Sequence, residues 1–182
     1  MALKLVKAPP VASDAELLEG LCVRDERAVT LTYRRYSRYV ANVAYRMLGS
    51  QDEVEDVVQH VFLELVRTAE RIYGPESLKS FLLALTSRQI SRRLTRRWRA
   101  RRLQSALELI LPRRSDPRET AELDELYVSL TGLSPELRVP WMLHHIEGQN
   151  LPDTAQACDV SLATVKRRIA RAEQLLGKRL WK

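Results

Sequence analysis

The residues most suited to a chemical role lie at positions 88–102, RQISRRLTRRWRARR, where eight of fifteen residues are arginine and none is acidic. Like charges packed this densely repel one another and weaken local structure unless an anionic partner offsets the repulsion. Arginine binds phosphate through a planar fork of donors and stacks on exposed bases. The chemistry that this segment favours is therefore non-covalent binding of nucleic acid.

At helical spacing the arginine segment separates into two faces. The inward face is expected to carry Ile90, Leu94 and Trp98, with Trp98 at its edge. The outer face carries Arg88, Arg92, Arg96 and Arg99, with Arg93 and Arg97 beside them. Release of about six counterions would give a log–log salt slope of about −4 to −5. The alternative is a solvated face, which would not require every cation to be arginine.

A second charged segment, residues 51–69, has the opposite sign. Its polar edge consists of Asp52, Glu55, Asp56 and Gln59, beside an apolar stripe that includes Phe62. No lysine or arginine occurs between Arg46 and Arg67. An acidic edge repels DNA and suits the docking of a basic helix from another protein. A solvated helix face is the alternative, and the neighbouring basic helix favours docking.

A helix-turn-helix pattern occupies residues 147–172, EGQNLPDTAQACDVSLATVKRRIARA, with a tight turn at residues 158–160. Its last helix should turn Val165, Ile169, Ala172 and Leu176 inward. The residues expected at the cap or outward are Ser161, Thr164, Lys166, Arg167, Arg168 and Arg171. A helix N-terminus with such cations suits the DNA major groove. The alternative is an amphipathic helix with a solvated basic face.

The sequence lacks the side-chain groupings of a metal site or a nucleophilic enzyme. Cys22 and Cys158 lie far apart and form no CxxC pair, so we expect two buried, reduced thiols. His144 and His145 are adjacent and would point about 100° apart on a helix. With His60 they form no set with a nucleophile. We expect no catalytic residue, no metal site and no cofactor.

Length and composition bound the class of protein. The chain has 182 residues, a net charge of +7 and 45% hydrophobic residues, enough for one domain or two small ones. This basic balance indicates a nucleic acid partner, or less often an anionic membrane surface. The apolar runs are too short for a spanning helix, and MALKLVKAPPV lacks a secretory apolar stretch. We expect no membrane insertion and a cytoplasmic location.

Apolar periods of three and four predict an all-helical chain. A capping box at residues 13–16 should open a helix near 14–22, and a second box at 50–53 a helix over 51–69. Asp25 should cap a helix over 26–48 that ends at Gly49. The inner face of this helix should carry Val29, Tyr33, Tyr36, Val40, Val43 and Met47. After a loop at 71–77, Ser77 should cap the arginine helix.

The C-terminal part begins after a proline-containing linker at residues 104–118. Helices are expected near 119–131, after Ser134-Pro135, over 151–158 behind the cap Asn150, and after the cap Ser161. The predicted fold class is all-α, with two small helical domains joined by a flexible linker and a helix-turn-helix in the second. The expected division is a disordered tail at 1–12, a first domain at 13–103, the linker at 104–118 and a second domain at 119–182.

The order of these parts resembles that of bacterial extracytoplasmic-function (ECF) sigma factors. The stretches that carry the resemblance are DEVEDVVQHVFLELVR at 52–67, LKSFLLALTSRQISRRLTRR at 78–97, LSPELRVPWMLHHIEGQN at 133–150 and TVKRRIARA at 164–172. It covers residues 14–103 and 119–180, nearly the whole chain. It implies a transcription initiation factor that binds RNA polymerase core, recognises promoter DNA and performs no catalysis itself.

The resemblance also implies a role for each group of residues. Residues that fall where the family docks on the beta-prime coiled coil of core polymerase are Asp52, Glu55, Asp56, Gln59 and Phe62. Residues that fall where it opens and reads the −10 element, with the 71–77 loop to hold a flipped base, are Arg88, Arg92, Arg93, Arg96, Arg97 and Trp98. Residues of the −35 recognition helix are Ser161, Thr164, Lys166, Arg167, Arg168 and Arg171. Further implied partners are the beta flap and an anti-sigma factor.

The chain departs from the family at several positions. Arg88 and Arg92 stand where asparagine and aspartate are common, which predicts a stronger phosphate grip. Pro140 should kink its helix or delay its start, and Asp159 replaces a turn glycine, so we expect a less stable C-terminal domain. Two other classes remain open: a helix-turn-helix regulator that binds duplex DNA without being a polymerase subunit, and a DNA-processing enzyme, which the histidines do not favour.

Overall fold

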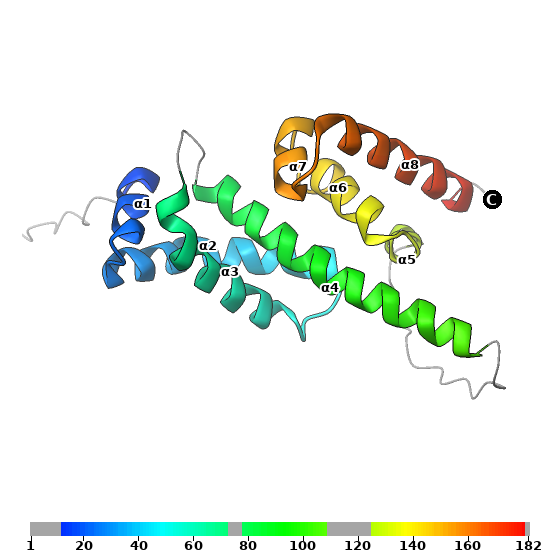
Figure 1. Ribbon diagram of the computed structural model, residues 1–182, viewed down its shortest axis with the longest axis horizontal. Coiled ribbons are helices and arrows are strands. Elements are labelled where there is room, and N and C mark those ends of the chain that lie inside the picture. Colours follow the sequence, from blue (N-terminus) through cyan, green and yellow to red (C-terminus); the bar gives the residue numbers. More distant parts are fainter. Residues whose placement is uncertain (1–11, 73–77, 109–124, 181–182) are drawn as a thin grey trace, which may run out of the picture.

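The computed structural model describes residues 12–72, 78–108 and 125–180 (Figure 1). These residues form eight α-helices and one 3-10 helix and contain no strand, which confirms the all-α class. No helix within these ranges is long and apolar enough to cross a membrane. The predicted tail, the loop expected to hold a flipped base and the linker lie wholly or mostly outside the described residues.

We call residues 12–108 the N-terminal lobe and residues 125–180 the C-terminal lobe. The N-terminal lobe contains α1 (Asp14–Cys22), α2 (Glu26–Leu48), α3 (Val54–Thr68), η1 (Ala69–Arg71) and α4 (Leu78–Glu108). The C-terminal lobe contains α5 (Glu125–Thr131), α6 (Pro135–His145), α7 (Leu151–Cys158) and α8 (Leu162–Leu180). Helix α4 crosses the middle of the molecule and packs on α2 and α3 of its own lobe and on α6 and α7 of the other (Figure 1).

The first helices begin and end at the predicted residues. Ser13 and Glu16 form the capping box of α1, in which the Ser13 amide donates to Glu16 Oε2 at 2.6 Å. The side chain of Asp25 accepts from two backbone amides at the start of α2. Gly49 ends α2 with a left-handed backbone, φ +70°. Local sequence signals are therefore sufficient to define these helix ends.

The start of α3 differs from the prediction. Residues 51–53 form a turn, and the helix begins at Val54. Glu53 occupies the cap position but makes no capping hydrogen bond, because its carboxylate accepts from the guanidinium of Arg97 on α4. The second capping box is thus wrong: a tertiary ion pair replaces a local one.

In the middle of the chain one predicted boundary changes, and the predicted helix start at Pro135 is confirmed. Helix α4 has 31 residues and continues to Glu108, beyond the expected start of the linker at 104. Helix α6 begins at Pro135 and continues through Pro140, so that proline does not delay its start. A proline costs a helix one backbone donor, and here the surrounding helices hold α6 in place because Val139, Pro140 and Met142 are all buried.

The helix-turn-helix forms as predicted. Asn150 caps α7 by accepting from the Asp153 amide at 2.8 Å, and Ser161 Oγ accepts from the Thr164 amide at 3.2 Å. Asp159 takes the left-handed conformation, φ 55°, that the turn requires. Aspartate adopts this conformation more readily than most residues, so the missing glycine does not prevent the turn.

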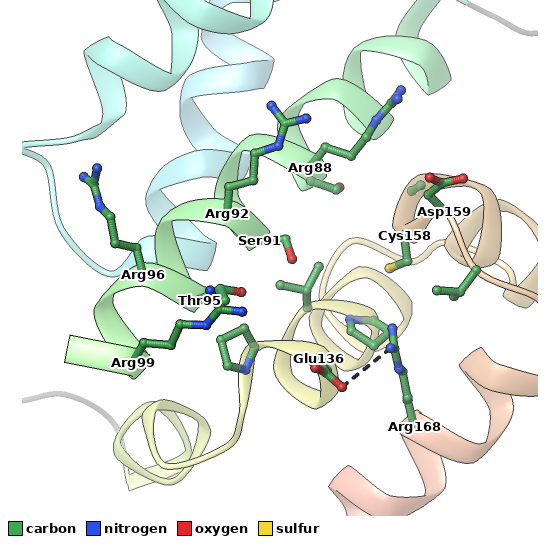
Figure 2. Close-up of a pocket in the computed structure, with 16 residues that line it drawn as sticks. Arg88, Ser91, Arg92, Thr95, Arg96, Arg99, Glu136, Cys158, Asp159 and Arg168 are labelled. Atoms are coloured by element: carbon green, nitrogen blue, oxygen red, sulfur yellow. Dashed lines mark ion pairs between the residues drawn. The ribbon is translucent and has the colours of Figure 1, made fainter. Parts of the chain in front are cut away.

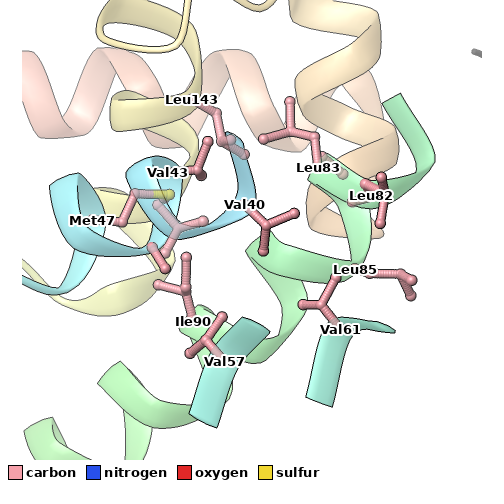
Figure 3. Packing of buried hydrophobic residues seen from close by; sticks show 14 of the residues in the cluster. Val40, Val43, Met47, Val57, Val61, Leu82, Leu83, Leu85, Ile90 and Leu143 are labelled. Carbon is pink, nitrogen blue, oxygen red and sulfur yellow. The ribbon is translucent and has the colours of Figure 1, made fainter. Parts of the chain in front are cut away.

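One hydrophobic core extends through both lobes. Val40 of α2, Val57 of α3 and Leu82 of α4 belong to the same buried cluster as Met142 and Leu143 of α6 (Figure 3). A second, smaller cluster holds the helix-turn-helix together and consists of Ala155, Val165 and Ile169. The sequence predicted two small helical domains on a tether, and in the structure the two lobes pack against each other.

Candidate nucleic-acid and partner interfaces

The arginines of α4 fall into two groups with different surroundings. Arg97 contacts Glu53 through two donors, Nη2 at 2.6 Å and Nε at 3.1 Å from Oε1. Arg93 Nη1 lies 3.6 Å from the other oxygen of Glu53 and 3.8 Å from Asp56 Oδ2. These two arginines therefore fasten α3 to α4, and acidic side chains of the same lobe offset their charge. We call Arg93 and Arg97 the paired arginines.

The second group, which we call the open row, consists of Arg88, Arg92, Arg96 and Arg99. These residues line one side of a groove of about 710 Å³ between α4 and the C-terminal lobe (Figure 2). None of the four forms an ion pair with another described residue, and Arg88 Nε donates to the Ala84 carbonyl of its own helix at 3.3 Å. The open row is thus available to an external anion.

The remaining walls of the groove come from both lobes. Ser91 and Thr95 of α4 also line it, together with Pro135, Val139 and Pro140 of α6. The end of α7 adds Cys158 and Asp159, as Figure 2 shows. One wall of the groove is therefore the cationic helix α4, and the other is a partly apolar surface of the C-terminal lobe.

Arg168 lies on α8, as expected, but its side chain is directed to the interlobe groove. Its Nη2 lies 3.6 Å from Glu136 Oε2, and its side chain lines the groove (Figure 2). Lys166, Arg167 and Arg171 are instead exposed on the outer side of α8. The outer cations of α8 and Arg168 thus face different surroundings, which the spacing of basic residues does not distinguish.

The acidic edge lies at the surface, as its pattern predicts. The exposed members are Asp52, Glu55, Asp56 and Gln59. Phe62, assigned to the same docking surface, is only 7% exposed, and the ring of Tyr33 packs edge-on against it at 4.9 Å. Tyr33 was expected inside but is 47% exposed, so it presents the aromatic surface beside the acidic edge. Tyr33 lies at the margin of the apolar stripe of α2. This position is the sequence feature that could have indicated its exposure.

Titratable side chains elsewhere serve structural contacts. His144 Nδ1 lies 2.7 Å from the Gln149 carbonyl, and His145 Nε2 lies 3.2 Å from Glu173 Oε1. Both cysteines are free thiols and half-buried, and burial raises the pKa of Cys158 to about 11. Within the described ranges, no three histidine, cysteine or acidic side chains are placed to hold a metal ion.

Each of the two lobes matches a known protein family model. The family model for sigma-70 region 2 matches residues 32–100, and that for sigma-70 region 4 matches residues 123–176. The ECF RNA polymerase sigma factor SigE of Mycolicibacterium smegmatis is 29% identical over 155 residues, which cover 79% of this chain and 58% of that protein. The chain belongs to the ECF sigma factors.

Other relatives match almost end to end. The ECF RNA polymerase sigma-E factor of Escherichia coli K12 is 25% identical over 182 residues, which cover 92% of this sigma factor and 94% of the relative. The sigma factor RpoE in complex with the anti-sigma factor NepR from Bartonella quintana has a TM-score of 0.59 at 19% identity, covering 84% of this chain and 96% of that one. CnrH in complex with the cytosolic domain of CnrY has a TM-score of 0.63 at 24% identity, covering 93% and 97%.

These comparisons decide between the open alternatives. Region 2 and region 4 models together include both the acidic and arginine helices and the helix-turn-helix. The protein is therefore a polymerase-binding transcription initiation factor, and an independent helix-turn-helix regulator is not favoured.

Proposed function

We propose that this sigma factor holds the strand of the −10 element on the open row of α4. The observation that carries the proposal is the separation of the arginines: Arg93 and Arg97 are paired with acids, whereas Arg88, Arg92, Arg96 and Arg99 have no described acidic partner. Guanidiniums without an internal counter-ion gain most from phosphate, since binding releases condensed cations from the DNA. Trp98 is half-buried under the guanidinium of Arg102, 4.9 Å from its ring centre, and marks the edge of this surface.

The acidic edge of α3 is proposed to dock on the beta-prime coiled coil of core polymerase. Asp52 and Glu55 have no described ion pair, and Asp56 has only a long contact of 3.8 Å to Arg93. Exposed carboxylates beside the aromatic ring of Tyr33 suit a basic helix with an apolar stripe. Phe62 is buried and packs against the Tyr33 ring. It would therefore contribute to docking by holding that ring in place.

Helix α8 is proposed to enter the major groove of the −35 element. Ser161 and Thr164 form its capped N-terminus, where backbone amides attract phosphate. Lys166, Arg167 and Arg171 are exposed along the outer side and can contact phosphate or guanine edges. Arg168 is paired with Glu136 and contributes to the structure of the groove. It would contribute to DNA binding only if that ion pair opened.

Further partners follow from the family. Solved relatives of similar fold were obtained as complexes with NepR, an anti-sigma factor, and with the cytosolic domain of CnrY. An anti-sigma factor and the beta flap of core polymerase are therefore proposed as partners of the two lobes. The chain would act in the cytoplasm, without catalysis of its own, and the polymerase would supply all bond making.

Run-off transcription with core polymerase on a promoter library tests the proposal. Wild-type protein should direct initiation at a specific set of promoters that core polymerase alone does not select. Asp56→Arg should abolish co-purification with core, whereas the same charge reversal at the exposed Glu19 of α1 should not. Absence of promoter selection by wild-type protein, or unchanged core binding by Asp56→Arg, would refute the function or the docking assignment, respectively.

A further inference from the structure

The interlobe groove has cations on both of its walls. The open row of α4 lies along one wall, and Arg168 of α8 lies on the other (Figure 2). Among the residues that line the groove, five are arginine and two are acidic, Glu136 and Asp159, so their net charge is +3. A cleft lined by an excess of one charge concentrates ions of the opposite sign. The groove therefore suits an anion that carries several charges.

The arginines nearest to both walls are available to such an anion. Arg168 Nη2 lies 3.6 Å from Glu136 Oε2, which is longer than a hydrogen bond, and 74% of the Glu136 side chain is exposed. Exposed ion pairs contribute little to stability, so Arg168 can exchange Glu136 for a phosphate. Across the groove, Arg99 extends toward α6 and forms no described ion pair (Figure 2). The two guanidiniums can thus hold one ligand from opposite sides.

The other members of the open row lie at the rim of the groove. Figure 2 shows the guanidiniums of Arg88, Arg92 and Arg96 extending away from α6, while the stems of these side chains line the groove. Long side chains with a charged head can turn on their apolar stems, so these arginines can fold over a bound anion. From Arg88 to Arg99 the helix rises about 16 Å. The negative charges of the ligand should therefore be spread along a chain.

Neutral residues complete the groove between the arginines. Ser91 and Thr95 of α4 each carry a hydroxyl that can donate to, or accept from, a sugar or phosphate group. On the side of α6, the groove is lined by Pro135, Val139 and Pro140, all of which are apolar and buried. Ligand sites commonly combine an apolar wall with a few polar groups that fix orientation. The ligand should therefore have an apolar, ring-bearing part beside its charged part.

The size of the groove limits the ligand to a small molecule. Its volume of about 710 Å³ lies within the range of small-molecule sites, roughly 300–1,000 Å³. The ligand must combine a chain of negative charges, hydroxyl groups and a planar apolar ring. A nucleoside triphosphate has these three parts in this order.

We propose that the interlobe groove binds a nucleoside triphosphate, with its phosphates between Arg168 and the open row and its base on the apolar surface of α6. Arginine suits the phosphates because its planar fork donates two parallel hydrogen bonds. Ser91 and Thr95 lie between the two parts of the site, beside the ribose. This site goes beyond the function proposed above and does not depend on it.

Isothermal titration calorimetry of the full-length protein tests the ligand class. The probes are ATP, GTP, inorganic tripolyphosphate and adenosine, each with EDTA, because divalent metal ions would offset the phosphate charge. ATP or GTP should bind, and tripolyphosphate should bind at least about tenfold more weakly because it lacks the base. Adenosine, without phosphates, should give no measurable binding. No binding of ATP or GTP overturns the site, and equal affinities for ATP and tripolyphosphate overturn the contact with the base.

Matched variants test the position of the site. Arg168→Gln should weaken ATP binding at least about tenfold, because it removes a charged contact. Arg171 lies on the same helix and is exposed outside the groove, so Arg171→Gln should stay within about twofold of wild type. On α4, Arg99→Gln is compared in the same way with Arg102→Gln, since Arg102 lies over the Trp98 ring and not on the groove. Equal losses within both pairs overturn the position.

Thiol protection gives a second readout of position. Cys158 lines the groove, whereas Cys22 lies in α1 and does not line it. In the Cys22→Ser variant, ATP at ten times its Kd should slow the reaction of Cys158 with a neutral maleimide about tenfold. In the Cys158→Ser variant, the reaction rate of Cys22 should not change with ATP. An unchanged rate at Cys158, or equal protection of both thiols, contradicts binding in the groove.

Competition with DNA separates this proposal from the proposed function. Both the nucleotide and the −10 strand need the open row, so ATP at ten times its Kd should raise the apparent Kd of a labelled single-stranded oligodeoxynucleotide about tenfold. Fluorescence anisotropy measures this change. Failure of the oligodeoxynucleotide to bind contradicts the strand contact of the proposed function, whereas the calorimetry still reports on the nucleotide. Protection of Cys158 by the oligodeoxynucleotide but not by ATP overturns the nucleotide site.

Discussion

The two groups of arginines on α4 share one helix and one residue type but differ in their partners. Arg93 and Arg97 lie close to Glu53 at the start of α3, whereas Arg88, Arg92, Arg96 and Arg99 line the interlobe groove and form no described ion pair. Arg93 has a side chain that is only 15% exposed, while Arg92, Arg96 and Arg99 are exposed.

The difference teaches that a run of like charge can serve two purposes. The paired arginines hold two helices of one lobe together, and each costs little in repulsion because an acid lies beside it. The open row retains its charge for a partner. Substitutions in the open row should therefore change DNA binding, whereas loss of the pairs at Arg93 and Arg97 should change the stability of the fold.

The largest effect is expected in the open row. Arg92→Ala/Arg96→Ala should weaken promoter binding by at least about 100-fold, because each charged hydrogen bond contributes roughly 1.5–3 kcal/mol. The slope of log affinity against log salt should fall by about 1.4–1.8 for two lost phosphate contacts. Fluorescence anisotropy over a salt series measures both, and the denaturation midpoint should not move. A large loss of stability would show that these arginines are structural.

Glu53→Ala addresses the paired arginines. Removal of the carboxylate leaves two partly buried guanidiniums without their acid and should lower the free energy of unfolding by about 1–3 kcal/mol. Urea denaturation measures this loss. The exposed Glu55, which has no described ion pair, is the matched control, and Glu55→Ala should change stability by less than about 0.5 kcal/mol. Similar values for the two variants would contradict the pairing.

A smaller contrast comes from conservative replacements. Arg97→Lys loses one of the two bonds to Glu53 and should cost about 0.5–1.5 kcal/mol, because an ammonium cannot reproduce the guanidinium fork. Arg96→Lys keeps a charge that has no described internal partner and should leave stability nearly unchanged. Thermal denaturation of both variants tests the contrast, which fails if Arg96→Lys is the less stable protein.

The smallest effect concerns Tyr36, whose hydroxyl shares the Asp14 carboxylate with Arg35. Arg35 lies 2.9 Å from Asp14, which also accepts from the Tyr36 hydroxyl at 2.6 Å. Burial and the bond to Asp14 raise the pKa of Tyr36 to about 12, above its ordinary value near 10. The folded state then holds its phenolic proton more tightly, so this stability is present below pH 10 and is lost as pH rises toward 12.

Alkaline denaturation of wild type and Tyr36→Phe measures this effect. The wild type should lose stability more steeply than Tyr36→Phe between pH 10 and 12, and the two curves should run parallel below pH 9. Parallel curves throughout would mean that Tyr36 titrates alike in the folded and unfolded chain.

Local signals in the sequence define much of the fold. The caps Ser13, Asp25 and Asn150 act on amides two or three residues away, and the left-handed Gly49 ends α2 as its type predicts. Such contacts depend on the conformation of a few neighbouring residues, so a sequence pattern contains them completely. The same reasoning extends to the helix-turn-helix, whose inward positions repeat at helical spacing.

The tertiary structure alone decides which charges remain free. Glu53 and Arg97 are 44 positions apart, and Arg46 and Glu147 are 101 apart, so helix packing brings them together. Packing likewise covers Phe62 with Tyr33 and directs Arg168 into the groove. The sequence by itself determined an all-helical chain with an acidic helix, an arginine helix and a helix-turn-helix. Which arginines face a partner, and that the lobes close on each other, depends on long-range contacts that no local spacing encodes.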